Sequence, residues 1–319
     1  MRETQHLSVL LANPRGFCAG VDRAISMVEN ALEKYGAPIY VRHQIVHNRH
    51  VVERLEGLGA IFVKELDEVP SGERVIFSAH GVAKSVPEQA ERLKLISFDA
   101  TCPLVTKVHK KAEHLINRGY HILLVGHAGH PEVVGTMGQV PPGHMTLVET
   151  AEDVEALTNL PADRQLAFIT QTTLSVDDTA SIVTALHNRF PDILAPKSED
   201  ICYATTNRQQ AIKAIAKRAD LVLVVGAANS SNSNRLVETA KGYGAPAAYL
   251  VADVSAIDWA WLDGVKTLGL TAGASAPEHL VQEIIDNLRQ RFDISMTETS
   301  GPLEDVIFRL PRELERIPA

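Results

Sequence analysis

Short apolar runs alternate with helical patterns along nearly the whole chain, and this alternation is the feature that most limits its fold. The runs are rich in β-branched residues and lack a strict apolar–polar alternation, as expected for strands covered on both faces. Eight strands are predicted on this basis: Val9–Ala12, Ile39–Val41, Val75–Ser78, Ile122–Val125, Leu166–Ile169, Leu221–Val225, Ala247–Leu250 and Thr267–Leu270. Strands that alternate with helices predict an α/β fold with largely parallel sheets.

The length of the chain and two breaks in the pattern predict its domains. A chain of 319 residues has room for two or three domains. The breaks fall near Leu95–Ala100 and Pro191–Asp200, and the residues from about Asp293 are rich in Pro, Glu and Thr. We therefore expect three similar α/β domains and a C-terminal tail that wraps the surface, at 1–97, 98–196, 197–291 and 292–319.

Three isolated cysteines share one kind of position. Each lies in a loop directly before a predicted helix, in GFCAGVDRAI (Cys18), DATCPLVTKV (Cys102) and DICYATTNRQQAI (Cys202). A helix N-terminus carries unpaired N–H groups and a partial positive charge, which lowers the pKa of a thiol and favours metal binding. No CxxC pair is present. The residues therefore leave two metal centres open: a three-cysteine zinc site, or a [4Fe–4S] cluster with one iron lacking a thiolate.

Composition and charge exclude several classes of function. The net charge of −8 gives no electrostatic footprint for nucleic acid. No apolar stretch approaches the ~20 residues of a membrane span, and Met1–His6 is too polar to begin a signal peptide. An odd number of cysteines without an export signal favours the reducing cytoplasm over a disulfide framework.

Polar clusters follow the predicted strands, where parallel α/β folds bind ligands. Hydrogen-bond donors dominate them, which suits an oxyanion such as a diphosphate held without a lysine clamp. Their members are His43, His47, His80, His127, His130, Glu132, Thr170, Thr172, Thr173, Asn229, Ser230, Ser231, Asn232, Ser233, Asn234 and Ser275. Glu132 is the one acid in these clusters, and a buried carboxyl beside a metal and an anion could move protons.

Long motifs in this chain resemble those of one enzyme family. They are PRGFCAGVDRAI, VHN, SAHGV, DATCPLVTKVH, GHAGHPEV, TQTTLSVDD, ICYATTNRQ, NSSNSNRL and TAGASAP, in order, from about residue 8 to residue 290. Together they are similar to 4-hydroxy-3-methylbut-2-enyl diphosphate reductases, which complete the methylerythritol phosphate route to isoprenoids. No functional position departs from the family's pattern.

The resemblance implies a fold, a cofactor and a reaction. Three α/β domains would form a trefoil around a central [4Fe–4S] cluster, and Cys18, Cys102 and Cys202 would each come from one domain. The reaction would be a two-electron, two-proton reductive dehydroxylation of the allylic diphosphate to isopentenyl and dimethylallyl diphosphates. The substrate hydroxyl would bind the open iron.

The resemblance also implies roles for individual residues and an electron donor. Glu132, helped by Thr172, would deliver protons. Thr172 would also contact the substrate, whose diphosphate would lie among His47, His80, His130, Ser230, Ser231, Asn232 and Ser275. A flavodoxin or ferredoxin would supply electrons.

Three other functions stay open from the residues. A hydro-lyase would use the open iron without a redox step, a cluster-based sensor would read oxygen or iron, and a zinc-dependent phosphoester enzyme would hold zinc instead.

Overall fold

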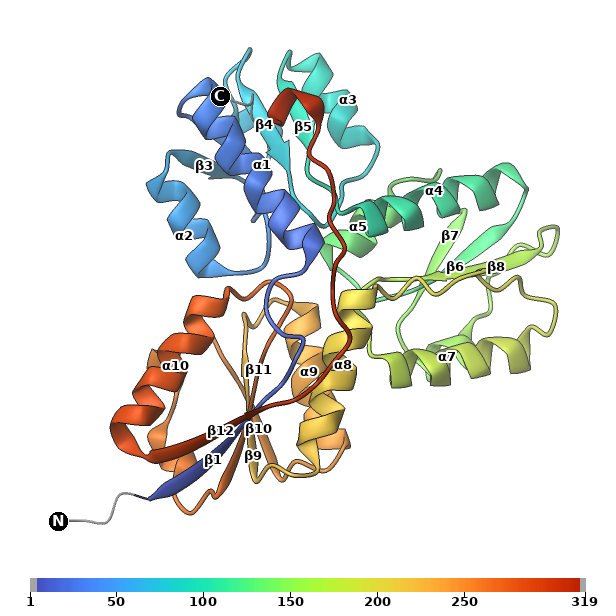
Figure 1. Ribbon diagram of the computed structural model, residues 1–319. Helices are drawn as coiled ribbons and strands as arrows, with labels where there is room; N and C mark the ends of the chain where they lie inside the picture. Colours follow the sequence, from blue (N-terminus) through green and yellow to red (C-terminus); the bar gives the residue numbers. More distant parts are fainter. Residues whose placement is uncertain (1–4, 316–319) are drawn as a thin grey trace. The chain divides into compact units, whose positions relative to one another are not determined.

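The computed structural model describes residues 5–315, which form two compact units (Figure 1). The first unit contains the chain up to Cys18, His47–Arg49 and Tyr203–Ile307. The second contains Ala19–Val46, His50–Cys202 and the chain from Phe308.

One five-stranded sheet, with strand order β10-β9-β11-β1-β12, organises the first unit. Its strands are β1 (His6–Leu11), β9 (Leu221–Val225), β10 (Ala247–Val251), β11 (Thr267–Ala272) and β12 (Asp293–Glu298). The helical elements are α8 (Tyr203–Ala216), α9 (Ser231–Gly242) and α10 (Glu278–Arg291), with the short 3-10 helices η2 (Val254–Ala256) and η3 (Trp259–Leu262). Every strand pair described in this sheet is parallel.

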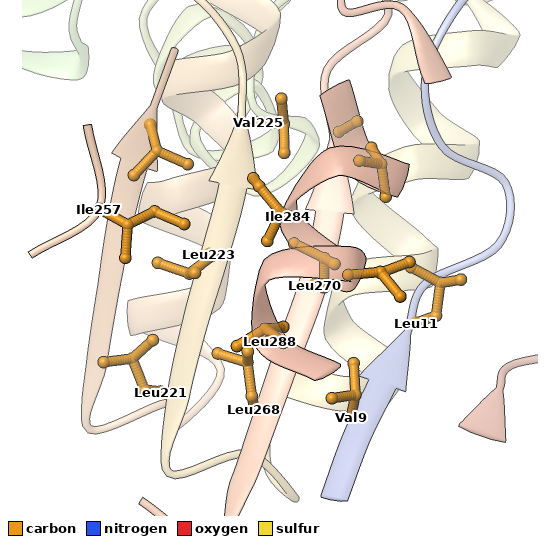
Figure 2. Close-up of a cluster of buried hydrophobic side chains, with 14 of the residues drawn as sticks. Val9, Leu11, Leu221, Leu223, Val225, Ile257, Leu268, Leu270, Ile284 and Leu288 are labelled. Carbon is orange, nitrogen blue, oxygen red and sulfur yellow. The ribbon is translucent and has the colours of Figure 1, made fainter. Parts of the chain in front are cut away.

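Helices cover both faces of this sheet, which explains why β9 is buried along its whole length. Successive side chains of a strand point to opposite faces. Figure 2 shows Leu223 and Val225 in the cluster that contains Ile284 and Leu288 of α10. The intervening residues of β9 pack instead with apolar residues of α8 and α9. A strand buried on both sides needs a continuous apolar run.

The second unit contains two smaller parallel sheets within the described residues, in the orders β3-β2-β4-β5 and β7-β6-β8. The strands are β2 (Ile39–Arg42), β3 (Ala60–Val63), β4 (Arg74–Phe77), β5 (Ile96–Asp99), β6 (His121–Val125), β7 (Met145–Val148) and β8 (Leu166–Thr170). The helices are α1 (Ala19–Tyr35), α2 (Arg49–Gly57), α3 (Ser85–Arg92), α4 (Pro103–Asn117), α5 (Pro131–Met137), α6 (Ala151–Ala156) and α7 (Val176–Arg189). Two 3-10 helices, η1 (Leu66–Glu68) and η4 (Arg312–Leu314), complete the unit.

The predicted α/β class with parallel sheets is confirmed, and each of the eight predicted strands is present. Strands β3, β5, β7 and β12 were not among the eight predicted strands. All four are edge strands of their sheets. An edge strand can remain partly exposed, so its sequence need not contain a continuous apolar run.

Strand pairing cuts across the segments expected from the sequence. β1 pairs with β11 and β12, so the first strand does not share a sheet with the rest of segment 1–97. The expected tail at 292–319 begins with β12, which continues this sheet. The division into three domains stays a prediction. In the described part of the chain, no helix is long and apolar enough to cross a membrane.

Two glycines let the start of α9 approach the ends of β9 and β11 very closely. A Cβ at Gly226 would lie 2.2 Å from Ser233 Oγ, and one at Gly273 would lie 2.1 Å from the same atom. Ser233 is fully buried. Ser230 caps the helix, because its side chain accepts a hydrogen bond from the Ser233 N–H. The sequence VVGAANSSNSN therefore places its Ser and Asn side chains directly at the strand ends.

Replacing Gly226 with Ala tests this close approach. Gly226→Ala forces the new methyl group into Ser233, and we expect a loss of about 1–3 kcal/mol in the free energy of unfolding. The matched control is Gly242→Ala in the same helix, where an added Cβ meets no atom within 4 Å. That change should be neutral or stabilise by up to about 1 kcal/mol. Equal effects in urea titrations would contradict the packing argument.

Candidate functional site

The structure places the three cysteines as the sequence predicts, each directly before a helix. Cys18 precedes α1, Cys102 is the N-cap residue of α4, and Cys202 precedes α8. All three are of intermediate exposure. In proteins generally, a helix N-terminus is a favourable position for a thiolate, which is the metal-binding form of cysteine.

In the second unit, two of these cysteines are hydrogen-bonded to the loops that follow strands β4 and β8. The Cys102 N–H donates to Ala79 O at 3.0 Å, next to His80. The Cys202 N–H donates to Thr172 O, also at 3.0 Å. Both cysteines are thereby fixed beside residues that the sequence analysis assigns to the site.

Glu132 and Thr172 form a buried pair in the same unit. The Thr172 N–H donates to Glu132 Oε1 at 2.6 Å, and Thr172 Oγ1 donates to Oε2 at 2.8 Å. The pKa of Glu132 is raised from 4.5 to about 7, mainly by burial. The two hydrogen bonds from Thr172 act against this shift, and the charge of Asp200 adds to it. The carboxyl is thus poised to hold or release a proton near neutral pH.

His80 and His130 extend this group. Their ring centroids lie 6.0 Å apart in an edge-to-face arrangement. His130 Nδ1 accepts from the Glu132 N–H at 3.1 Å, so the proton of a neutral ring lies on Nε2. Glycine allows the close approach of α5 to the loop after β4, because a Cβ at Gly135 would lie 3.1 Å from the Gly81 carbonyl.

In the first unit, the structure gathers a second set of predicted site residues. Asn229 Nδ2 lies 3.1 Å from His47 Nδ1. Ser275 Oγ donates to His47 O at 3.1 Å and lies 3.4 Å from Ser230 Oγ. Ser231 is the first residue of α9. Chain segments far apart in sequence thus meet at the carboxyl ends of β9 and β11.

Asn232 leaves a buried donor in this set. Its Oδ1 accepts from the Ala274 N–H at 2.7 Å, while Nδ2 is buried and has no hydrogen-bond partner among the described residues. A buried donor without a partner is costly, and an anionic ligand would satisfy it. The set can therefore bind an oxyanion.

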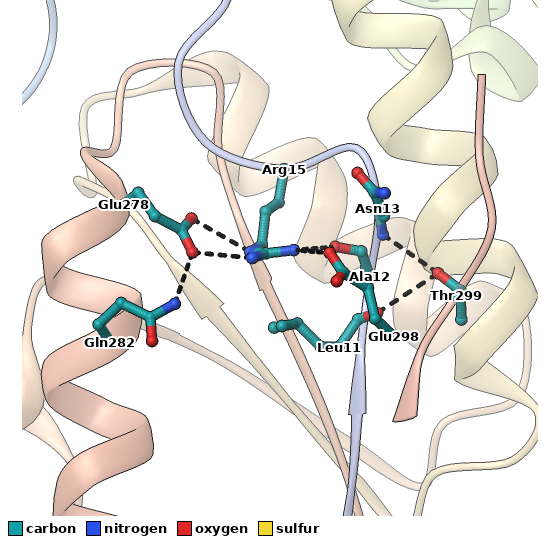
Figure 3. A network of polar contacts seen from close by, with 8 residues as sticks. All are labelled: Leu11, Ala12, Asn13, Arg15, Glu278, Gln282, Glu298 and Thr299. Atoms are coloured by element: carbon teal, nitrogen blue, oxygen red, sulfur yellow. Dashed lines mark hydrogen bonds and ion pairs between the residues drawn. The ribbon is translucent and has the colours of Figure 1, made fainter. Parts of the chain in front are cut away.

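The loop that carries Cys18 is also tightly held within the first unit. Figure 3 shows Arg15 in contact with Glu278, Glu298 and Ala12. Arg15 Nη2 pairs with Glu278 Oε1 at 2.8 Å, and Nη1 pairs with Glu298 Oε1 at 2.6 Å. Gly16 has a φ of +66°, a left-handed conformation that favours glycine, and this turn leads the chain to Cys18.

The predicted site residues therefore form two groups, one in each unit. Cys102, His80, His130, Glu132, Thr172 and Cys202 are linked in the second unit, while His47, Ser230, Asn232 and Ser275 meet in the first. Among the residues described, no three His, Cys, Asp or Glu side chains gather around one metal-ion position.

Sequence reasoning missed three buried or half-buried charged residues near the cysteines: Lys111, Asp200 and Arg208. The Arg208 side chain and the Asp200 carboxyl are fully buried. The one signal in the sequence was proximity, since each of these residues lies within nine residues of a cysteine. A charge at such a place is ordinarily read as a solvated residue.

Known proteins resemble this chain over nearly its whole length. The family model described as LytB protein matches residues 9–289. A protein of Hyphomonas neptunium named 4-hydroxy-3-methylbut-2-enyl diphosphate reductase is 62% identical over 309 residues, covering 97% of this chain and 98% of its own length. Its counterpart of the same name from Phenylobacterium zucineum is 60% identical, with the same coverage.

Two solved structures have a similar fold. One, titled as the E-1-hydroxy-2-methyl-but-2-enyl-4-diphosphate reductase from Plasmodium falciparum, gives a TM-score of 0.91 at 40% identity and covers 97% of each chain. Another, titled as (E)-4-hydroxy-3-methyl-but-2-enyl diphosphate reductase, gives a TM-score of 0.63 at 31% identity. It covers 89% of this chain and 99% of that one.

The raised pKa of Glu132 predicts how stability changes with pH. The unfolded chain loses this proton near pH 4.5, whereas the folded protein keeps it to about pH 7. Between these values the folded state binds more protons, so the free energy of unfolding falls as pH rises. The free energy of unfolding of Glu132→Gln, measured relative to that of wild type, should therefore rise by about 3 kcal/mol between pH 4.5 and pH 8.

Urea titrations of metal-free protein across this pH range measure the difference. The matched control is Glu152→Gln, because Glu152 is an exposed acid. It gives the difference between variant and wild type for a carboxyl that water solvates. A Glu132→Gln difference that varies with pH no more than that of Glu152→Gln would contradict the raised pKa.

Proposed function

Because the chain belongs to the LytB protein family, we propose that it reduces 4-hydroxy-3-methylbut-2-enyl diphosphate to isopentenyl and dimethylallyl diphosphates. The family membership confirms the resemblance that the motifs predict, and the chain is an oxidoreductase of this family. In the proposed reaction the allylic C–O bond breaks. Two electrons and two protons enter, and the hydroxyl leaves as water.

One observation carries this proposal more than any other: Thr172 is hydrogen-bonded to both Glu132 and Cys202. Its N–H and hydroxyl donate to the Glu132 carboxyl, and its carbonyl accepts from the Cys202 N–H. A buried acid is therefore joined through a single residue to the main chain of a cysteine at a helix start. This pairing suits a proton transfer beside a metal centre.

A [4Fe–4S] cluster held by Cys18, Cys102 and Cys202 is the cofactor that we propose. The donor set fits it, since three partly exposed cysteines stand at helix N-termini and would each supply a thiolate to one of the four irons. When bound, the cluster would supply the electrons and an open iron that acts as a Lewis acid toward the substrate hydroxyl. The trefoil arrangement of domains around it is part of the same proposal.

Glu132 is the proposed proton donor. With a pKa of about 7, the buried carboxyl carries a proton in about half of the molecules at neutral pH and can release it readily. Thr172 Oγ1 lies 2.8 Å from Glu132 Oε2 and fixes the orientation of the carboxyl. Thr172 is thereby a helper to the acid and a candidate contact for the substrate hydroxyl.

The diphosphate is proposed to bind the hydrogen-bond donors that the family resemblance implies: His47, His80, His130, Ser230, Ser231, Asn232 and Ser275. The support is chemical, because imidazole, hydroxyl and amide groups can donate to the many acceptor oxygens of a diphosphate. Asn232 Nδ2 is the donor with the clearest support, because it is buried and has no hydrogen-bond partner in the described part of the chain. Donors of this kind bind an anion without a basic surface.

A requirement for an external reductant distinguishes the proposed reaction from the rival functions. A flavodoxin or ferredoxin in the cytoplasm is the proposed donor. A hydro-lyase would turn over without a reductant, and a sensor would not turn over this substrate at all. A zinc phosphoester enzyme would contain zinc and release phosphate.

Loss of one cysteine tests the cluster. Anaerobically purified wild-type protein should contain about four irons and four sulfides per chain. Cys102→Ser should lose the full cluster, because serine is a poor replacement for the thiolate. The control, Thr184→Ala, removes an exposed hydroxyl from α7 and should retain the iron. A complete cluster in Cys102→Ser, or zinc in the wild type, would overturn the assignment.

Loss of the acid tests the chemical step. Glu132→Gln preserves the shape of the side chain but cannot give up a proton, so kcat should fall by about 10²-fold or more. Substrate affinity, measured by calorimetry, should stay within about threefold, since the diphosphate donors are unchanged. The contrasting variant, Asn232→Ala, should weaken affinity and affect kcat less. Normal turnover by Glu132→Gln would rule out its role.

A further inference from the structure

We propose that Arg23, Lys111 and Arg208 are positioning residues. Each lies in the helix that follows one of the proposed cluster cysteines, and each holds the loop before another of these cysteines. This inference rests on the proposed function, in which the three thiols bind one cofactor. It concerns residues to which neither the motifs nor the reaction assigns a role. Each of the three contacts lies within a single unit.

Arg208 of α8 holds the loop of Cys18. Its side chain is fully buried, and Nε and Nη2 donate to Gly16 O at 2.9 and 2.7 Å. Nη2 also donates to Phe17 O at 3.0 Å. The two carbonyls belong to the residues directly before Cys18. A planar guanidinium that binds both of them fixes the direction in which the chain reaches the thiol.

Arg23 of α1 holds the loop of Cys102. Its Nη1 donates to Thr101 O at 3.2 Å, and this carbonyl belongs to the residue before the cysteine. Asp99 steadies the same loop by accepting from the Thr101 N–H at 2.9 Å. Burial lowers the pKa of Arg23, while the charges of Asp99 and Cys102 oppose that shift and favour the cation.

Lys111 of α4 holds the loop of Cys202 through Asp200. Lys111 Nζ forms an ion pair with Asp200, whose side chain is fully buried. The other carboxylate oxygen of Asp200 accepts from the Thr170 N–H at 3.2 Å. The segment two residues before Cys202 is thus fixed to α4 and to the end of β8.

These three contacts follow a closed order along the chain. The helix after Cys18 holds the loop of Cys102, the helix after Cys102 holds the loop of Cys202, and the helix after Cys202 holds the loop of Cys18. Each cysteine therefore lies between a loop held by one cation and a helix that carries another. We call Arg23, Lys111 and Arg208 the three loop cations.

The buried pairs also explain why charge is used here. A buried ion pair contributes little net stability compared with apolar packing, but it demands one geometry. Two of the loop cations form ion pairs in which one side chain is fully buried, namely Arg208 with Glu304 and Lys111 with Asp200. Their arrangement is therefore better suited to fixing the position of a thiol than to stabilising the fold.

Peptide-resolved hydrogen exchange on the cluster-loaded chain tests the closed order. Arg23→Met, Lys111→Met and Arg208→Met are compared with Lys110→Met, which removes an exposed cation from α4. We expect amide exchange to accelerate about tenfold or more in one loop per variant: before Cys102, Cys202 and Cys18 respectively. The control should leave all three loops unchanged. Release of iron to a chelator should quicken in the three variants alone.

The outcomes separate this inference from the proposed function. Equal acceleration in all three loops, or none, would overturn the inference even where the cluster binds. A wild-type chain that takes up no cluster from ferrous iron and sulfide would overturn the proposed function, while exchange on the same metal-free chains still tests the three contacts. Arg208→Lys covers the case in which Arg208→Met does not fold. It keeps the charge but loses the planar fork, and unchanged exchange before Cys18 in that variant would contradict the proposal.

Discussion

Parallel strand pairing is the constraint on which the rest of this molecule depends. In a parallel sheet all strands end at one edge, and the helices that follow begin there. Every strand pair in the described residues is parallel, so polar residues after the strands and thiols before the helices meet at shared edges. Thr172 after β8 and Cys202 before α8 are joined in this way. The chemistry of the site is thus a consequence of topology.

This arrangement buries an ionisable group, the Glu132 carboxyl. A carboxyl buried with two donors from Thr172 would ordinarily ionise easily, yet burial outweighs those hydrogen bonds and raises its pKa to about 7. Asp200, which belongs to the loop of Cys202, adds a negative charge that acts in the same direction. The loop that presents the thiol therefore also helps keep the acid protonated.

Structural features that follow from a local sequence pattern can be predicted from the sequence. Features that depend on contacts with distant segments of the chain cannot. Buried strands such as β9 and the helix-start position of each cysteine follow from periodicity and spacing. Edge strand β12 does not, because DISMTE has no apolar run and becomes a strand by pairing with β1. For the same reason the site's donors could be named from strand ends, but Arg208 could not. Its role depends on carbonyls about 190 residues away in the sequence.

The C-terminal segment illustrates how such distant partners combine. From the sequence it is a polar tail expected to wrap the surface. In the structure, Glu304 makes a two-pronged ion pair with Arg208, at 3.0 and 3.2 Å, and so neutralises a guanidinium that is otherwise buried against main-chain carbonyls. Further along, Arg309 O accepts from Arg23 Nε at 3.0 Å. Two of the three loop cations thus depend on the segment that is least informative in sequence. The tail belongs to the machinery that fixes the thiols.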